Sequence, residues 1–239
     1  MTPGAAPSTT VVDVDTPAGP ARVHVTRPRG ARGLAVLGHG AGGGLGSVDL
    51  TAAATALTGA GWAVALVEQP WLVAGWRIAG PPKTLDAAWV PVVNALRRRG
   101  GALATVRGPL LLAGRSAGAR VACRTADTLG ADAVLCFSFP LHPPGRPERL
   151  RATELALVTD ADRAIAVVQG ERDPFGGPGE VAAYLPGLGT GRQHLYAVPG
   201  THAIPRSSAP LVEQAVAAFA STVLASTVLA GTVLAGTVG

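Results

Sequence analysis

The sequence is nearly without lysine, and its positive charge is carried by arginines that are spread along the chain. Lys83 is the only lysine among 239 residues, and the formal net charge is +5. The arginines form a continuous run only at 97–99, at the end of a predicted helix, where the helix dipole favours cations. Because nucleic-acid binding needs basic residues gathered on one face, we expect no nucleic-acid partner.

Cysteine is also scarce, which argues against a domain stabilised by disulfides and against one stabilised by zinc. Cys123 and Cys136 are the only two cysteines, and their spacing matches neither a disulfide framework nor a zinc site. The segment 1–10 holds neither a basic cluster nor an apolar core, so it does not have the pattern of a secretory signal. We therefore expect a cytoplasmic protein that holds no metal.

Strand-like and helix-like segments alternate along most of the chain. Two segments with period-two alternation, 10–16 and 21–27, predict a hairpin. Later apolar runs predict buried strands at 33–40, 62–70, 109–114, 131–139, 163–170 and 193–200. Helices are predicted between or after them at 47–60, 84–99, 117–129, 147–158, 178–185 and 208–225. This alternation is typical of a parallel sheet with helices on both faces, whose sites lie beyond the carboxyl ends of the strands.

The end of the chain repeats a five-residue unit and differs in composition from the rest. Residues 221–239 read STVLA, STVLA, GTVLA and GTVG, and no charge follows Glu213. A period of five fits neither helix nor strand, and the many serine, threonine and glycine residues argue against a membrane anchor. We predict one domain over 10–220, with the first repeat finishing its last helix, and a frayed low-complexity tail over 221–239.

A Gly-x-Ser-x-Gly pattern stands where a predicted strand turns directly into a predicted helix. Gly114 and Gly118 flank Ser116 and lack the Cβ atoms that would clash in so tight a turn. This context is that of a nucleophile elbow, in which the serine hydroxyl is exposed at the edge of the sheet. An ordinary turn serine is the alternative interpretation.

A glycine-rich loop, GHGAGGG at 38–44, follows an earlier strand and offers unpaired backbone N–H groups. An alkoxide that forms on a substrate carbonyl needs such donors in place beforehand, and we predict the N–H groups of Ala41 and Ala117 as the pair. A phosphate-binding loop is the alternative, but no Gly-Lys-Ser or Gly-Lys-Thr follows.

A base and an acid are available at the ends of later strands. His202 follows a strand and precedes the last helix, so we predict it as the general base; His142 is the rival, and His39 is expected to be structural. Asp173 ends another strand and is the predicted acid that orients the histidine. The alternative for Asp173 is a turn residue before proline.

The order Ser116, Asp173, His202 is that of the α/β-hydrolase fold. The segments GRSAGARVA, FPLHPPGRPERL and QGERDPFG resemble the α/β-hydrolase-like family that includes bacterial predicted hydrolases, a testis-expressed animal protein and a subunit of the NSL chromatin complex. VEQPWLVAGWRIAG and TLDAAW resemble the bacterial branch. The resemblance covers about 10–220 and implies that these three residues are nucleophile, acid and histidine.

Two positions depart from the family pattern without touching those three residues. Ala119 stands where a third glycine is common, and Thr201 stands before the histidine where aspartate is frequent. The second departure alters the surroundings of the histidine.

We therefore predict an α/β-hydrolase fold with a mostly parallel central sheet, helices on both faces and no large cap domain, because only 140–163 separate two strands. The expected activity is serine hydrolysis of small carboxylic esters or thioesters, without a metal or organic cofactor and without a membrane partner. Trp71, Trp76 and His142 are expected to wall part of an open site. A catalytically silent interaction module, as the chromatin-complex member implies, is the alternative.

Overall fold

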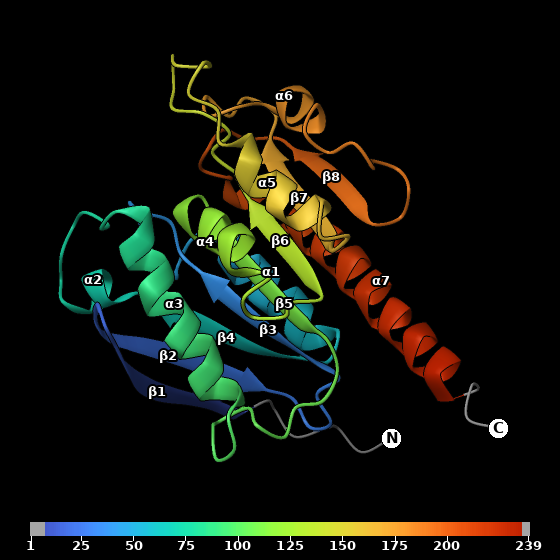
Figure 1. The fold of residues 1–239 in the computed structure, drawn as a ribbon. Helices are drawn as coiled ribbons and strands as arrows, with labels where there is room; N and C mark the ends of the chain where they lie inside the picture. Colours follow the sequence, from blue (N-terminus) through green and yellow to red (C-terminus); the bar gives the residue numbers. More distant parts are fainter. Residues whose placement is uncertain (1–7, 236–239) are drawn as a thin grey trace.

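One eight-stranded sheet runs through the centre of the molecule (Figure 1), in the order β1-β2-β4-β3-β5-β6-β7-β8. The computed structural model describes residues 8–235, and the side chains of 9–226. The pairs β1–β2 and β2–β4 are antiparallel and all other pairs are parallel, which confirms the mostly parallel sheet. The strands are β1 (Ser8–Thr16), β2 (Gly19–Arg27), β3 (Gly33–Gly38), β4 (Trp62–Glu68), β5 (Leu110–Arg115), β6 (Ala133–Phe137), β7 (Ala164–Gly170) and β8 (Gln193–Val198).

Helices cover both faces of this sheet, as the alternating pattern predicts. Figure 1 shows α3, α4 and α5 on the near face and α1 and α7 on the far face. The helices are α1 (Val48–Gly59), α2 (Pro70–Val73), α3 (Pro82–Arg97), α4 (Ala117–Thr125), α5 (Ala152–Thr159), α6 (Pro178–Ala182) and α7 (Ala209–Ala235), with a 3₁₀ turn at Arg206–Ser208.

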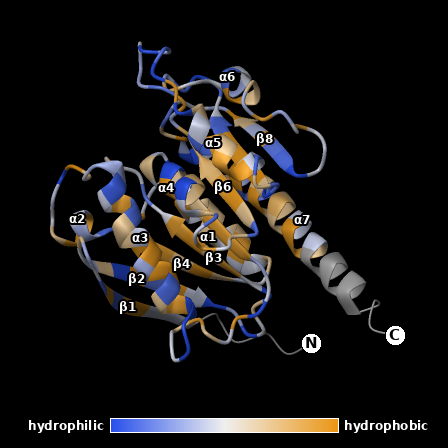
Figure 2. Ribbon diagram, viewed as in Figure 1, coloured by the Kyte–Doolittle hydropathy of each residue, from blue (hydrophilic) through white to orange (hydrophobic). Residues whose placement is uncertain are grey.

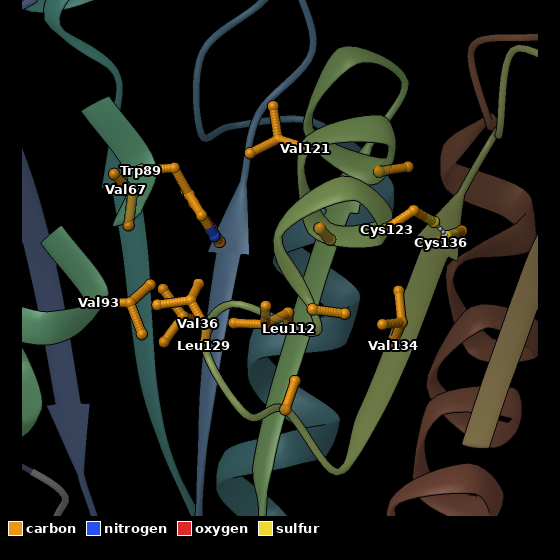
Figure 3. Packing of buried hydrophobic residues seen from close by; sticks show 14 of the residues in the cluster. Val36, Val67, Trp89, Val93, Leu112, Val121, Cys123, Leu129, Val134 and Cys136 are labelled. Carbon is orange, nitrogen blue, oxygen red and sulfur yellow. Dashed lines mark hydrogen bonds between the residues drawn. The ribbon is translucent and has the colours of Figure 1, made fainter. Parts of the chain in front are cut away.

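The central strands are apolar on both faces because both faces are covered. Val36, Leu112 and Val134 lie in the core under α3 and α4 (Figure 3), while their neighbours along the strands belong to a second core under α1 and α7. Figure 2 shows these strands as hydrophobic, with polar residues on the surrounding helices and loops. The uninterrupted apolar runs of the sequence follow from this two-sided burial.

The two cysteines are in contact in the core, although their spacing in the sequence does not predict this contact. Their Sγ atoms lie 3.6 Å apart between α4 and β6 (Figure 3), and both thiols are free and buried. The contact with Cys136, followed by burial, raises the pKa of the Cys123 thiol. A buried thiol of this kind is unreactive and serves as packing.

Several helices differ from those predicted. The helix α5 begins at Ala152 rather than 147, and α3 and α6 end at Arg97 and Ala182 rather than 99 and 185. The predicted loop after β4 contains the short helix α2, and α3 begins at Pro82 because proline at the first helical position sacrifices no hydrogen bond. The helix α4 ends at Thr125, and turns occupy the rest of the predicted segment.

The expectation that the five-residue repeat would end the last helix is wrong, since α7 continues to Ala235. Its buried residues Val212, Val216, Phe219 and Val223 follow the three- and four-residue spacing of a helix, so the first repeat still faces the core. Within the first repeat, Val223 is 4% exposed and Leu224 packs against the same core. The last four residues of the predicted tail lie outside the described residues.

One described segment, Arg206–Ser226, is long and apolar enough to cross a membrane by length and composition alone. Val212, Val216 and Phe219 in this segment are 0% exposed, in a core that also contains residues of α1 and the sheet. Packing inside the domain thus accounts for part of its hydropathy, since 39% of an 18-residue stretch within it is buried.

The connection between β6 and β7, residues 138–163, contains α5 as its one helix. A connection of this length leaves the carboxyl edge of the sheet without a cap domain.

Candidate active site

Ser116 stands at the turn between β5 and α4 in a backbone conformation that non-glycine residues rarely adopt. Its φ is 51° and its ψ is −109°, a strain of about 1–3 kcal/mol. A Cβ atom at Gly114 would lie 2.3 Å from the carbonyl carbon of Gly118, and one at Gly118 would lie 2.3 Å from the carbonyl oxygen of Gly38. The turn therefore requires glycine at both flanking positions.

His202 reaches Ser116 from the loop between β8 and α7. Its Nε2 lies 2.9 Å from Ser116 Oγ, and its Nδ1 lies 2.9 Å from Oδ2 of Asp173. The loop passes close over the end of β7, where a Cβ at Gly170 would lie 2.3 Å from the carbonyl oxygen of Thr201. Because Nδ1–H donates to the carboxylate, Nε2 is left to accept the hydroxyl proton of Ser116.

Asp173 is held by donors that the sequence interpretation missed. Its side chain is 0% exposed. Oδ2 accepts a hydrogen bond from Gln169 Nε2 at 3.1 Å, and Oδ1 accepts one from the backbone N–H of Phe175 at 2.9 Å. A buried carboxylate requires such partners. The one signal in the sequence is that Gln169 interrupts the apolar run AIAVV at the end of β7.

The side chain of Phe175 was also missed as a part of the site. Its ring lies over the imidazole of His202, with 4.1 Å between the ring centroids and 33° between the planes. Phe175 therefore contacts the histidine with its ring and the acid with its backbone.

The glycine-rich loop lies beside the serine. A Cβ at Gly40 would be 3.4 Å from Cβ of Ser116. Neither the N–H of Ala41 nor that of Ala117, which begins α4, donates a hydrogen bond to any other described residue. Two unpaired N–H groups near a serine hydroxyl could bind an oxygen that gains negative charge.

The buried His39 holds this glycine-rich loop in place through two hydrogen bonds. Its Nδ1–H donates to the carbonyl oxygen of Gly40 at 2.9 Å, and its Nε2 accepts from the backbone N–H of Gln69 at 3.1 Å. Burial lowers the pKa of His39, so the ring stays neutral. These contacts agree with a structural role.

Each of the three residues predicted to wall the site has other contacts or surroundings in the structure. Trp71 packs edge-on against the ring of His39, with 5.1 Å between the ring centroids. Trp76 is 65% exposed and lines, with Trp71, a cavity of about 40 Å³ that does not include Ser116. His142 Nε2 pairs instead with Glu180 Oε1 at 3.2 Å. A role of these side chains in substrate binding stays a prediction.

No group of three or more histidine, cysteine, aspartate or glutamate side chains suited to a metal ion occurs among the described residues. The groups that the structure brings together at the site are a hydroxyl, an imidazole and a carboxylate, with backbone N–H groups nearby.

Comparison with known proteins identifies the family and the fold of the chain. A family model described as alpha/beta hydrolase domain matches residues 31–227. The chain belongs to this alpha/beta hydrolase family. Curated protein sequences give no match.

Solved structures with the same fold cover nearly the whole hydrolase. An a/b serine hydrolase without lid from Xanthomonas campestris has 21% identity and a TM-score of 0.68 over 92% of this chain and 97% of its own. Est1E from Butyrivibrio proteoclasticus has 16% identity and a TM-score of 0.71 over 90% and 99%. Dienelactone hydrolase from Anabaena variabilis has 20% identity and a TM-score of 0.68 over 93% and 99%. At these identities the likeness establishes the fold.

The first prediction concerns the elbow of this hydrolase. Gly118→Ala should lower the free energy of unfolding by about 1–3 kcal/mol, because the added methyl overlaps backbone atoms of Gly38 that cannot move aside. Urea unfolding followed by tryptophan fluorescence measures the change. Gly59→Ala, whose Cβ would meet no atom within 4 Å, is the control and should be as stable as the wild type or more so. Equal stability of Gly118→Ala and the wild type would contradict the requirement for glycine.

The second prediction concerns the pair formed by His142 and Glu180. Hydrogen bonds to the Pro143 carbonyl and to Glu180 raise the pKa of His142 above its ordinary 6.5. Hydrogen bonds from Gly177 N–H and from His142 lower the pKa of Glu180 below its ordinary 4.5. Because folding raises its pKa, protonated His142 stabilises the folded state below pH 6.5. Because folding lowers its pKa, ionised Glu180 stabilises the folded state above pH 4.5. The ion pair therefore contributes most to stability between these two pH values.

Glu180→Gln should accordingly lower the melting temperature more at about pH 5.5 than at about pH 8.5. Glu171→Gln changes an exposed carboxylate on the loop that precedes α6 and is the control, with the same small effect at both pH values. A Glu180→Gln effect that does not vary with pH would show that the ion pair does not form.

Proposed function

We propose that this alpha/beta hydrolase cleaves small carboxylic esters or thioesters, with Ser116 as nucleophile, His202 as general base and Asp173 as the acid that orients the histidine. The hydrogen-bonded chain from the Ser116 hydroxyl through both ring nitrogens to the carboxylate, with 2.9 Å at each step, supports this most strongly. Such a chain activates a hydroxyl, because the histidine accepts the proton and the carboxylate stabilises the resulting cation.

In the first half of the proposed reaction, Ser116 Oγ attacks the carbonyl carbon while its proton moves to His202 Nε2. The carbonyl oxygen becomes an oxyanion, for which the N–H groups of Ala41 and Ala117 are the proposed donors. The bond to the leaving group then breaks, the leaving oxygen or sulfur takes the proton from Nε2, and the acyl group stays on Ser116.

In the second half, a water molecule gives a proton to His202 Nε2 as its oxygen attacks the acyl carbon. The bond to Ser116 breaks, the serine recovers the proton, and a carboxylic acid leaves. These steps require no metal or organic cofactor.

The preference for small acyl groups is supported by the short connection between β6 and β7, which holds α5 and no cap domain. The Xanthomonas campestris hydrolase of the same fold is also described as lacking a lid. An open site buries few methylene groups, each of which contributes about 0.8 kcal/mol to binding.

The proposal also places the protein in the cytoplasm, on the cysteine pattern of its sequence, with neither nucleic acid nor membrane as partner. The alternative is a catalytically silent interaction module, in keeping with the resemblance to a chromatin-complex subunit. The alternative requires no activated serine, so a test of serine reactivity separates the two.

The third prediction is that a fluorophosphonate labels the native protein at Ser116 alone, because ordinary serine hydroxyls are inert near neutral pH. Ser116→Ala should abolish labelling and His202→Ala should nearly abolish it. Asp173→Asn should lower the turnover of p-nitrophenyl acetate about 10²- to 10⁴-fold, as a misoriented base does. Mass spectrometry of the labelled peptide and initial rates are the measurements.

Ser207→Ala, an exposed serine in the segment that follows His202, is the control and should keep both labelling and turnover. If folded wild-type protein takes up no label and hydrolyses no activated ester, the interaction module is the better account. Labelling that survives Ser116→Ala would identify a different nucleophile.

The fourth prediction concerns acyl length. The kcat/KM of p-nitrophenyl esters should be highest from acetyl to butyryl and should fall for octanoyl and dodecanoyl, because an open site gives long chains little apolar surface to contact. A steady rise to dodecanoyl would count against a small substrate.

A further inference from the structure

Arg115, the residue before the proposed nucleophile, has a charged side chain that the proposed chemistry does not use. Along β5, Leu111 and Ala113 belong to the core under α1 and α7, and Arg115 is the next residue in this alternation. Its side chain is only 16% exposed. A guanidinium in such a place needs an anion and hydrogen-bond acceptors.

Asp49 supplies the anion from the first turn of α1. Its side chain is 1% exposed, and its Oδ2 lies 3.0 Å from Arg115 Nε, without the alignment of a hydrogen bond. The other oxygen, Oδ1, accepts the backbone N–H of Leu50 at 2.8 Å. Because both charges are buried, removal of either one would leave the other uncompensated.

The same guanidinium contacts both loops that surround Ser116. Nη2 donates a hydrogen bond to the carbonyl oxygen of His202 at 2.8 Å. Nη1 lies against Gly40 of the glycine-rich loop, where an added Cβ would be 2.8 Å from it. One planar group thus joins α1, the histidine loop and the glycine-rich loop.

His202 is consequently held at three places. Asp173 binds its Nδ1 and Phe175 covers its ring, so these two residues set the orientation of the imidazole. Arg115 binds the carbonyl group and so restrains the backbone to which the imidazole is attached.

We propose that Arg115 and Asp49 form a positioning ion pair, which fixes the histidine loop and the glycine-rich loop at a set spacing around Ser116. The inference rests on the proposed hydrolase function and gives Arg115 no contact with substrate. A guanidinium suits this role because its donors point in fixed directions, whereas a lysine ammonium is a single point charge on a flexible stem.

Two sets of substitutions test the ion pair. Arg115→Met combined with Asp49→Leu removes both charges, leaves none unpaired, and should therefore fold. Its kcat should fall about 10²-fold, the cost of a displacement of about 1 Å, while KM changes less than about threefold. Arg115→Lys keeps a cation opposite Asp49, so it should keep the melting temperature yet lose kcat by at least about tenfold.

Leaving-group dependence separates misplacement of His202 from loss of folded protein. Ethoxide needs a proton from His202 as it leaves, whereas p-nitrophenolate does not. The ratio of kcat/KM for p-nitrophenyl acetate to that for ethyl acetate should therefore rise about tenfold in both sets of variants. A smaller folded fraction would lower both values equally.

Arg124→Met is the matched control. The Arg124 side chain is also 16% exposed and pairs with Asp86, between α4 and α3 on the opposite face of the sheet. This variant should melt at a lower temperature and keep the wild-type ratio of the two esters.

A nuclear magnetic resonance measurement gives a reading that does not depend on turnover. The His202 Nδ1 proton, bound to Asp173, should give a downfield resonance that shifts or broadens in the Arg115 variants and stays in Arg124→Met. If wild-type protein hydrolyses no ester but this resonance responds as stated, the proposed function fails and the positioning role is supported. An unchanged ester ratio in an active double variant, or an unchanged resonance in an inactive one, overturns the positioning role.

Discussion

The close approach of α4 to the ends of β3 and β5 is the constraint on which the candidate site depends. No side chain separates Gly118 from the carbonyl group of Gly38, and none separates Gly114 from Gly118. The helix can therefore begin immediately after Ser116, and its first N–H groups lie next to the serine hydroxyl. The strained backbone of Ser116 is held from its other side, since its N–H donates to the carbonyl oxygen of Phe137 at 2.9 Å.

Buried polar groups position Asp173, the acid of the candidate site. Gln169 is 0% exposed. Its amide contacts both backbone groups of Phe139, the carboxylate of Asp173 and the carbonyl oxygen of Gly176. An amide buried without partners would be costly, and one that is fully bonded allows a single arrangement of the loops around it. The position of Asp173 is therefore set by Gln169 at the end of β7 together with the backbone N–H of Phe175 in the loop.

Ser116 and Asp173 could be predicted because each follows an apolar run that is buried on both faces, and His202 because it follows the last strand. Ser116, Asp173 and His202 stand at the carboxyl ends of β5, β7 and β8, and parallel strands bring these ends to one edge. The partners of these residues could not be predicted in the same way. Arg115 meets Asp49 across 66 positions of sequence, a separation that follows from their numbers, and neither residue carries a local pattern that indicates the other.

Helix boundaries show the same division between local and long-range causes. In the first repeat of α7, Val223 is buried by its tertiary neighbours rather than by any local signal. Cys123 and Cys136 likewise come together because α4 packs on β6. Apolar periodicity indicates which side of an element is buried, but the identity of the element that covers it is a property of the fold.

Because the fold has no cap domain, the order of the loops around Ser116 depends on contacts with the rest of the domain. Without a lid, loops at the carboxyl edge of a sheet have solvent on one side and need their order from the other. Here Arg115 restrains the histidine loop and the glycine-rich loop from the side of α1, and Gln169 restrains the acid loop from the end of β7. Phe175 then joins the acid loop to His202 through its ring. Arg115 and Gln169 thus restrain these loops from the strands β5 and β7, and Phe175 restrains His202 from within the acid loop.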